Sequence, residues 1–135
     1  MGHRQIRLGS LSPTRDFNFV ADTCAAFQAI AGCDAALGQV VNAASNFEIS
    51  IGDTAALIGE VMNVELEIVT DEKRLRPEGS EVNRLFGDNS RLRQLTGWQP
   101  AYGGLEGFRR GLARTAEWFN DPANLARHRP GSYAV

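Results

Sequence analysis

Lysine, histidine, cysteine and tyrosine are scarce in this chain of 135 residues, and each scarcity excludes a kind of site. Thirteen of the fourteen cationic residues are arginine, and Lys73 is the only lysine. A phosphate-binding loop of the G-x-x-x-x-G-K type needs a glycine directly before its lysine, and Lys73 follows a glutamate. The arginine bias has two readings: arginine favours bidentate contacts with anions, or the bias reflects genome composition.

The histidines and cysteines do not form a recognisable metal or catalytic pattern. His3 and His128 lie near the two ends, and neither has a cysteine or acid at metal-ligand spacing. The sequence therefore argues against a zinc site and against a serine–histidine site. Cys24 and Cys33 are nine residues apart in a predicted helix, so we expect buried thiols in a reducing compartment rather than a disulfide framework.

Long apolar runs and a strong net charge are also absent. No apolar run approaches the ~18 residues that span a bilayer, and the first ten residues lack the apolar core of a leader segment. The formal net charge is −2, with 43% hydrophobic and 22% charged residues. We therefore expect one folded domain over residues 1–135, located in the cytoplasm, with neither nucleic acid nor membrane as a partner.

Hydrophobic spacing predicts interspersed strands and helices. Strands are predicted at 5–8, 39–43 and 64–69, and helices at 20–30, 51–62, 90–96 and 105–119, followed by a helical turn near Pro122. Val20, Cys24, Phe27 and Ile30 are predicted to form the inward side of the first helix, and Ser50 with Asp53 is predicted to cap the second. The pattern predicts an α/β or α+β fold, with a small mixed sheet of short strands and four to five helices.

Two arginine-bearing segments are the candidates for ligand binding. Thr14, Arg15 and Asp16 form the first, and residues 74–78, RLRPE, form the second. Each borders a predicted strand, which is where small α/β folds place ligands. Two arginines converging on a diphosphate would make charge-assisted, bidentate contacts. The alternative is two solvated surface loops, and spacing alone does not decide between them.

Four segments resemble one enzyme family in the correct order. The segments are LGSLSPTRDFNFVADTCAAF (8–27), VVNAASNFEISIGDTAALIGEVM (40–62), RLRPEGSEVNRLFGDNSRLRQLTGWQP (74–100) and LEGFRRGLARTAEWF (105–119). Together they are similar to the extended short-chain dehydrogenase/reductases that act on nucleotide sugars, the NAD-dependent epimerases and 4,6-dehydratases. The phrases SPTRDFNFV, SNFEISIGD and RLRPEGSEV look closest to bacterial amino-sugar-nucleotide 4,6-dehydratases, such as those making legionaminic acid precursors.

The resemblance covers residues 6–119 and implies the C-terminal, substrate-binding lobe of such an enzyme, followed by a tail at 120–135. In the family, a separate Rossmann half supplies the glycine-rich NAD loop and a Tyr-x-x-x-Lys pair. Pairing with Lys73 would require a tyrosine at position 69, which is Val69. The resemblance therefore implies that this chain has no catalytic residue and binds no NAD by itself.

The same resemblance assigns roles to four candidate binding residues and to Asp16. Arg15 and Arg76 would contact the phosphate oxygens of a nucleotide-diphosphate sugar, and Glu81 would lie near the ribose or base. Asn42 would tie a strand end to a loop, with ligand contact as the alternative. Asp16 would orient Arg15 or cap the following segment.

Two functions remain open from the sequence. The first is a truncated or free-standing nucleotide-sugar-binding lobe. It would be catalytically inactive alone, or it would be a subunit that pairs with a separate NAD-binding chain. The second is an oligomerisation or protein-interaction module derived from that lobe. Because half of such an enzyme would leave apolar area uncovered, we expect a homo-oligomer in either case.

Overall fold

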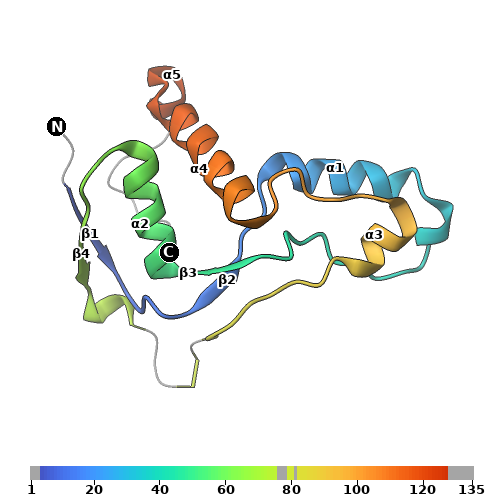
Figure 1. Cartoon of the computed structure of the whole chain (residues 1–135), viewed down its shortest axis with the longest axis horizontal. Coiled ribbons are helices and arrows are strands. Elements are labelled where there is room, and N and C mark those ends of the chain that lie inside the picture. The colour runs from blue at the N-terminus through green and yellow to red at the C-terminus, as the bar shows by residue number, and fades with distance from the viewer. Residues whose placement is uncertain (1–3, 76–78, 81, 128–135) are drawn as a thin grey trace.

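The computed structural model describes residues 4–75, 79–80 and 82–127 of the chain (Figure 1). These residues form four short strands, five α-helices and two 3₁₀ turns. In chain order they are β1 (Gln5–Leu8), β2 (Thr14–Asp16), α1 (Val20–Ala31), η1 (Asp34–Ala36), β3 (Glu48–Ser50), α2 (Ile51–Met62), β4 (Glu67–Thr70), η2 (Glu72–Arg74), α3 (Ser90–Thr96), α4 (Gly104–Asn120) and α5 (Pro122–Leu125). The predicted α/β class is confirmed.

The strands form two separate ribbons instead of the expected single mixed sheet. β1 pairs with β4 in parallel, with Gln5 opposite Glu67 and Leu8 opposite Thr70. β2 pairs with β3 in antiparallel fashion, with Asp16 opposite Glu48. The segment 14–16, expected as a loop, is therefore a strand.

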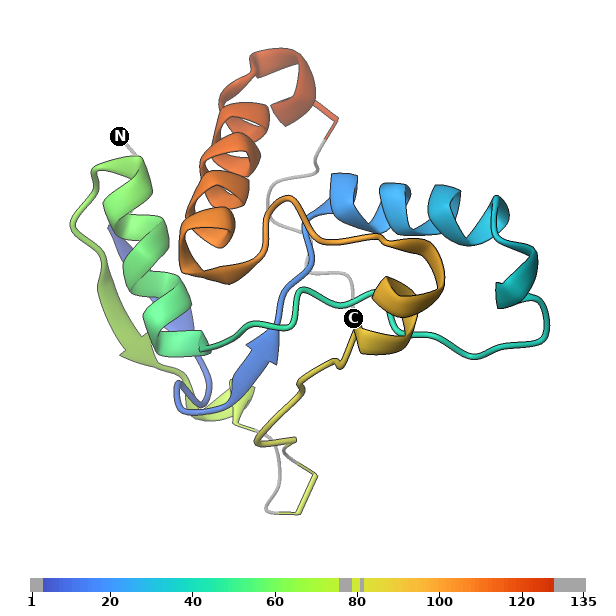
Figure 2. The same cartoon turned by 45° about the vertical axis from the view of Figure 1, so that its right-hand side comes forward.

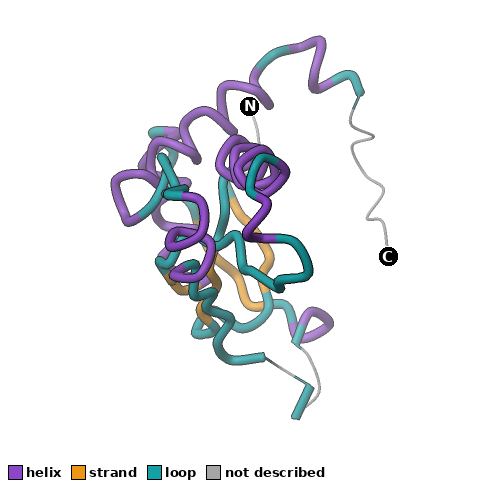
Figure 3. Tube along the Cα trace, turned by 90° about the vertical axis from the view of Figure 1, so that its right-hand side faces the viewer, coloured by secondary structure: helices purple, strands orange, loops and turns teal. Residues whose placement is uncertain are grey.

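The two ends of the molecule are built from different elements. At one end α2 lies beside the β1–β4 ribbon, and at the other α1 lies beside α3 (Figures 1 and 2). The long helix α4 packs against α2, where Arg109 forms an ion pair with Glu60. Viewed end-on, the strands lie centrally and the long helices lie above them (Figure 3). The β2–β3 ribbon connects the two ends.

One hydrophobic cluster of the core sits between α1 and α3. Ala26 and Leu92 are completely buried, and Trp98 is 7% exposed. Around them pack the partly buried side chains of Ala29, Ile30, Val41 and Ala43. Within the described part of the chain, Leu92 is the one large side chain that is fully buried. Further apolar packing lies outside this cluster, where Ile49, Ala55 and Leu57 are buried and Phe108 of α4 stacks on Phe17.

Of the four residues predicted to face inward on α1, Ile30 packs against the core and the other three do not. Val20 and Phe27 are each 67% exposed and Cys24 is exposed, whereas Asp22 and Ala26 are buried. The physical reason is the Asp22 carboxylate, which accepts the backbone amides of residues 101 and 102, both at 2.9 Å. This polar contact turns the helix and exposes its apolar stripe. The prediction of buried thiols is also wrong, since Cys33 is only half-buried.

The predicted helix cap and helix end that depend on neighbouring residues are present in the structure. The Ser50 Oγ accepts the amide of Asp53 at 2.9 Å and donates to its carboxylate at 2.6 Å, which confirms the predicted cap of α2. Gly97, with φ of 72°, ends α3 as expected. By contrast, residues 39–43 pair with no other described strand, and the predicted strand at 64–69 starts only at Glu67.

None of the helices within the described ranges has the length and apolar character needed to cross a bilayer.

Replacing Asp22 with alanine should lower the free energy of unfolding by about 2–4 kcal/mol, because two amides around a buried side chain would lose their charged acceptor. The measurement is urea unfolding followed by circular dichroism. Asp34→Ala is the matched control, since Asp34 is an exposed aspartate on the neighbouring turn, and it should change stability by less than about 0.5 kcal/mol. Equal losses in both variants would show that the Asp22 contact does not hold α1.

Candidate functional site around strand β2

Strand β2 lies between two partners. On one edge it pairs with β3, and on the other it pairs with residues 83–85. The amide of Thr14 donates to the carbonyl of Asn83 at 2.9 Å, and the amide of Leu85 donates to the carbonyl of Thr14 at 3.0 Å. Three segments that are distant in sequence therefore meet at β2.

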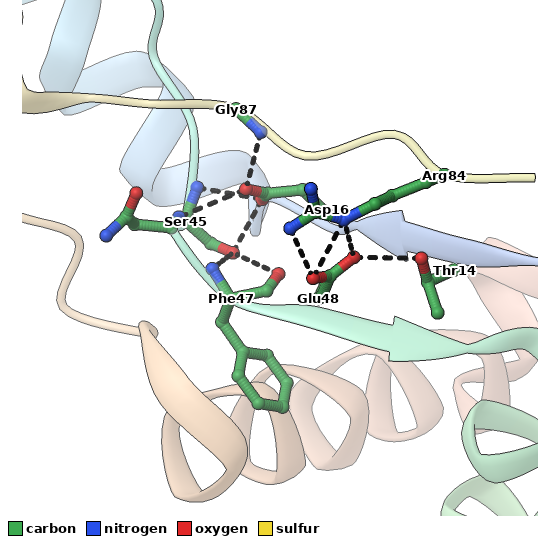
Figure 4. Close-up of polar contacts among 8 residues, drawn as sticks. Thr14, Asp16, Ser45, Phe47, Glu48, Arg84 and Gly87 are labelled. Carbon is green, nitrogen blue, oxygen red and sulfur yellow. Dashed lines mark hydrogen bonds and ion pairs between the residues drawn. The ribbon is translucent and has the colours of Figure 1, made fainter.

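The carboxylate of Asp16 holds two of these segments together (Figure 4). It accepts the amide and the hydroxyl of Ser45 at 2.9 and 2.6 Å, the amide of Asn46 at 3.1 Å and the amide of Gly87 at 3.3 Å. Asn46 adopts a left-handed conformation with φ of 58°, which asparagine tolerates better than most residues. These contacts differ from both roles expected for Asp16, since the carboxylate organises two other chain segments.

Glu48 lies directly opposite Asp16 in the β2–β3 ribbon, and like charges in that position repel. Arg84 relieves this repulsion. Its Nε and Nη2 donate to the Glu48 carboxylate at distances from 2.7 to 3.1 Å, and the Thr14 hydroxyl donates at 2.9 Å. The hydrogen bonds from Arg84 and then Thr14 lower the pKa of Glu48 below its ordinary value of 4.5. The guanidinium of Arg84 also lies 4.9 Å from the ring centre of Phe86.

The described residues before and after the second arginine segment lie against the stretch that leads into β2. At its start, the amide of Asp71 donates to the carbonyl of Leu8 at 2.7 Å. A Cβ on Gly9 would come within 2.5 Å of the Arg74 carbonyl oxygen, so only glycine permits this approach. At its end, residues 83–85 pair with Thr14. Arg76 and Glu81, predicted from the resemblance to bind the ligand, lie outside the described residues.

Arg15 and Asn42 are both described, but they are not brought together. Side chains alternate along a strand, so Arg15 lies on the opposite face of β2 from Asp16. Arg15 is half-buried, and its Nη1 donates to the Thr14 carbonyl at 2.8 Å. Asn42 is exposed and donates to the carbonyl of Asp88 at 3.3 Å, so it does tie two segments together. No strand is present there, in contrast to the expectation.

An open hollow of about 400 Å³ lies on the Asp16 side of β2. It is lined by Asp16, Asn18, residues 41–44 and residues 85–87. The Asn18 amide donates to the Ala43 carbonyl at 3.1 Å, and the buried Asn89 amide donates to the Ala44 carbonyl at 2.9 Å. These side-chain donors hold segment 41–44 where neighbouring strand bonds are absent.

Sequence reasoning missed Thr14, Glu48 and Arg84 as a connected group. One signal was available: Glu48 is a charged residue in a strand-like EIS run, so its side chain needed a partner across the ribbon. Nothing in the sequence identified Arg84 as that partner. In the described ranges, no three His, Cys, Asp or Glu side chains are grouped so as to hold a metal ion.

The short strands, five helices and β2-centred arrangement place the chain among α/β proteins that share part of the short-chain dehydrogenase/reductase fold. The chain belongs to the family described as GDP-mannose 4,6 dehydratase, an NAD-dependent epimerase/dehydratase family, which matches residues 1–111.

Two curated relatives show the same kinship. GDP-6-deoxy-D-mannose reductase of Pseudomonas aeruginosa is 34% identical over 96 residues, which cover 71% of this chain and 31% of the relative. UDP-glucose 4-epimerase of Mycolicibacterium smegmatis is 32% identical over 114 residues, which cover 84% of this chain and 33% of the relative. The chain thus spans about a third of the length of the curated relatives it matches.

Solved structures agree on the fold. An epimerase from Methanothermobacter thermautotrophicus superposes with a TM-score of 0.78 and 28% identity, covering 92% of this chain and 35% of that one. The protein RMD from Pseudomonas aeruginosa, complexed with NADPH, superposes with a TM-score of 0.67 and 28% identity. The match covers 84% of this chain and 36% of RMD. UDP-glucose 4-epimerase of Thermotoga maritima, solved with UDP-glucose, gives 0.72 at 20% identity, covering 88% and 35%, and supports the fold alone.

Below about pH 4.5 the wild-type chain should lose stability in a way that Glu48→Gln does not. The Glu48 pKa is lowered in the folded state, so its contribution is present above the unfolded pKa and disappears as pH falls through the folded pKa. Urea unfolding from about pH 3 to about pH 7 measures the slope of the free energy of unfolding against pH. Glu65→Gln, which replaces an exposed glutamate on the connection before β4, should keep the wild-type slope. Identical slopes for all three proteins would contradict the assignment.

Proposed function

We propose that this chain is the substrate-binding, C-terminal part of a nucleotide-sugar epimerase or dehydratase and that it holds the diphosphate of a nucleotide sugar. The observation that carries the proposal is that residues 71–74 and 83–85, which precede and follow the stretch with Arg76, contact residues 8–14. Residues 8–14 lead directly into Arg15. The described residues before and after the Arg76 stretch therefore lie next to the segment that carries Arg15.

The chemistry of the proposed contact is ion pairing with directional hydrogen bonds. A diphosphate presents several oxygens, and a planar guanidinium can donate to two of them at once. Arg15 is half-buried, which weakens screening by salt and strengthens each contact. Arg76 is proposed as the second phosphate contact and Glu81 as the contact to the ribose or base. Asn42 lies beyond Asp16 on the other face of β2, so we assign it a structural role.

The relatives support this class of ligand. The curated relatives are named as a GDP-6-deoxy-D-mannose reductase and a UDP-glucose 4-epimerase, and RMD is solved with NADPH. We propose that hydride transfer with NAD(P) belongs to a part that this chain does not contain, because Lys73 cannot complete a Tyr-x-x-x-Lys pair. Within the family, the phrases around Arg15, Glu48 and Arg76 favour an amino-sugar nucleotide of the kind used by legionaminic-type 4,6-dehydratases. Without the NAD(P)-binding part, the chain would bind a nucleotide sugar but would not convert it to product.

Arg15→Ala should weaken binding of a nucleotide-diphosphate sugar at least about tenfold, since one charge-assisted contact is worth ~1.5–3 kcal/mol. Isothermal titration with UDP-, GDP- and dTDP-sugars measures the dissociation constants. Arg93→Ala is the matched control because Arg93 is an exposed arginine on α3, and it should change affinity less than about twofold. Arg76→Ala should resemble Arg15→Ala.

Three results would overturn the proposal. The first is that none of the nucleotide sugars binds to the folded wild-type chain. The second is that Arg93→Ala weakens binding as much as Arg15→Ala, which would indicate non-specific attraction. The third is turnover of a nucleotide sugar by the wild-type chain with added NAD, which would contradict the assignment of hydride transfer to a missing part.

A further inference from the structure

Thr14 connects the Arg15 side chain to two neighbouring segments of the chain. Its carbonyl oxygen accepts Arg15 Nη1 at 2.8 Å and also the backbone amide of Leu85 at 3.0 Å. Its hydroxyl donates to the Glu48 carboxylate at 2.9 Å. The residue whose carbonyl contacts the Arg15 guanidinium is therefore held by β3 on one side and by residues 83–85 on the other.

Arg84 fixes residues 83–85 against the β2–β3 ribbon. It stands between Asn83 and Leu85, which each form one backbone hydrogen bond with Thr14. Its Nε lies 2.9 and 3.1 Å from the two oxygens of the Glu48 carboxylate, and its Nη2 lies 2.7 Å from one of them. A guanidinium in this forked geometry fixes direction as well as distance. Figure 4 shows the Glu48 carboxylate in contact with both Arg84 and Thr14.

The Glu48–Arg84 pair lies on the opposite face of β2 from Arg15. Glu48 is directly across the ribbon from Asp16, and side chains alternate along a strand. A ligand on the Arg15 face would therefore not touch the pair. Its route to Arg15 is the backbone of Thr14.

We propose that Glu48 and Arg84 are positioning residues, which hold Arg15 in place for the diphosphate of the nucleotide sugar. This inference rests on the proposed function and adds two residues to it that do not contact the ligand. While the Thr14 carbonyl is fixed, the Arg15 guanidinium is directed before the ligand arrives, so less conformational freedom is lost on binding. Without the pair, residues 83–85 keep only their backbone bonds to Thr14, and the carbonyl is free to shift.

The sign of the effect separates positioning from long-range electrostatics. Glu48 carries a negative charge one residue pair away from a proposed anion site. If charge alone mattered, removing it would strengthen the binding of an anion. Positioning predicts the opposite, namely that Glu48→Gln weakens binding. Glu48 is thus a more informative target than Arg84, whose loss weakens binding by either route.

The first test is isothermal titration with the nucleotide sugar that the wild-type chain binds most tightly. Glu48→Gln should raise the dissociation constant about three- to tenfold, the effect of one misplaced hydrogen-bonding group. Glu65→Gln is the matched control, because it removes the same charge from an exposed glutamate before β4, and it should change the constant less than about twofold. Circular dichroism confirms that both variants are folded.

The same titration in an Arg15→Lys background shows whether Glu48 acts through Arg15. Lysine keeps the positive charge but lacks the planar fork that the Thr14 carbonyl directs. Arg15→Lys should bind more weakly than wild type, and adding Glu48→Gln should change its dissociation constant less than about twofold.

A further measurement requires no ligand. In the ¹⁵N NMR spectrum of the arginine side-chain N–H groups, the Arg15 signal is identified by its loss in Arg15→Lys. Glu48→Gln should shift this signal in the ligand-free chain, because the carbonyl that holds the guanidinium moves. Glu65→Gln should leave it in place.

The results distinguish failure of this inference from failure of the proposed function. A wild-type chain that binds none of the nucleotide sugars overturns the proposed function, and the positioning role with it. If wild type binds and Glu48→Gln binds equally well or more tightly, the proposed function stands and the positioning role is wrong. An equal loss from Glu48→Gln in the Arg15→Lys background, or an unshifted Arg15 signal, also overturns it.

Discussion

The carboxylate of Asp16 is the contact on which the central part of the structure depends. It accepts four hydrogen bonds, from the turn at residues 45–46 and from Gly87, segments far apart in the sequence. The hydrophobic cluster of Ala26, Leu92 and Trp98 does not include residues 45–46 or Gly87. An ionised acceptor can hold several amides at once, and such bonds are stronger than those between neutral groups. A polar contact therefore adds to apolar packing in joining these segments.

The Asp22 carboxylate, six residues later in the chain, acts in the same way. Its carboxylate accepts two amides from the connection between α3 and α4, and this contact sets the rotation of α1. The consequence is unusual for an amphipathic helix, since Val20 and Phe27 point outward. The two aspartates lie six residues apart, in the stretch RDFNFVAD. One short segment thus fixes both the site strand and the exposed face.

Features fixed by neighbouring residues could be predicted from the sequence. The cap formed by Ser50 and Asp53, the end of α3 at Gly97 and the extent of α2 all follow from local backbone chemistry. The inward side of α1 and the missing strand at 39–43 depend on distant partners, which spacing does not reveal. The same holds for the pairing of Glu48 with Arg84. Of the four predicted ligand residues, the structure describes Arg15 and Asn42 and separates them on opposite faces of β2.

That separation sharpens the functional interpretation of the arginine. Because Asp16 occupies one face of β2 with backbone contacts, Arg15 is placed on the other face by the alternation of the strand. The adjacent acid is therefore committed to the amides of residues 45, 46 and 87 and serves to fix the strand that carries the cation. Glu48 is likewise occupied by Arg84 and Thr14. Both carboxylates are engaged on the Asp16 face, and we therefore propose the Arg15 face of β2 as the side that an anionic ligand contacts.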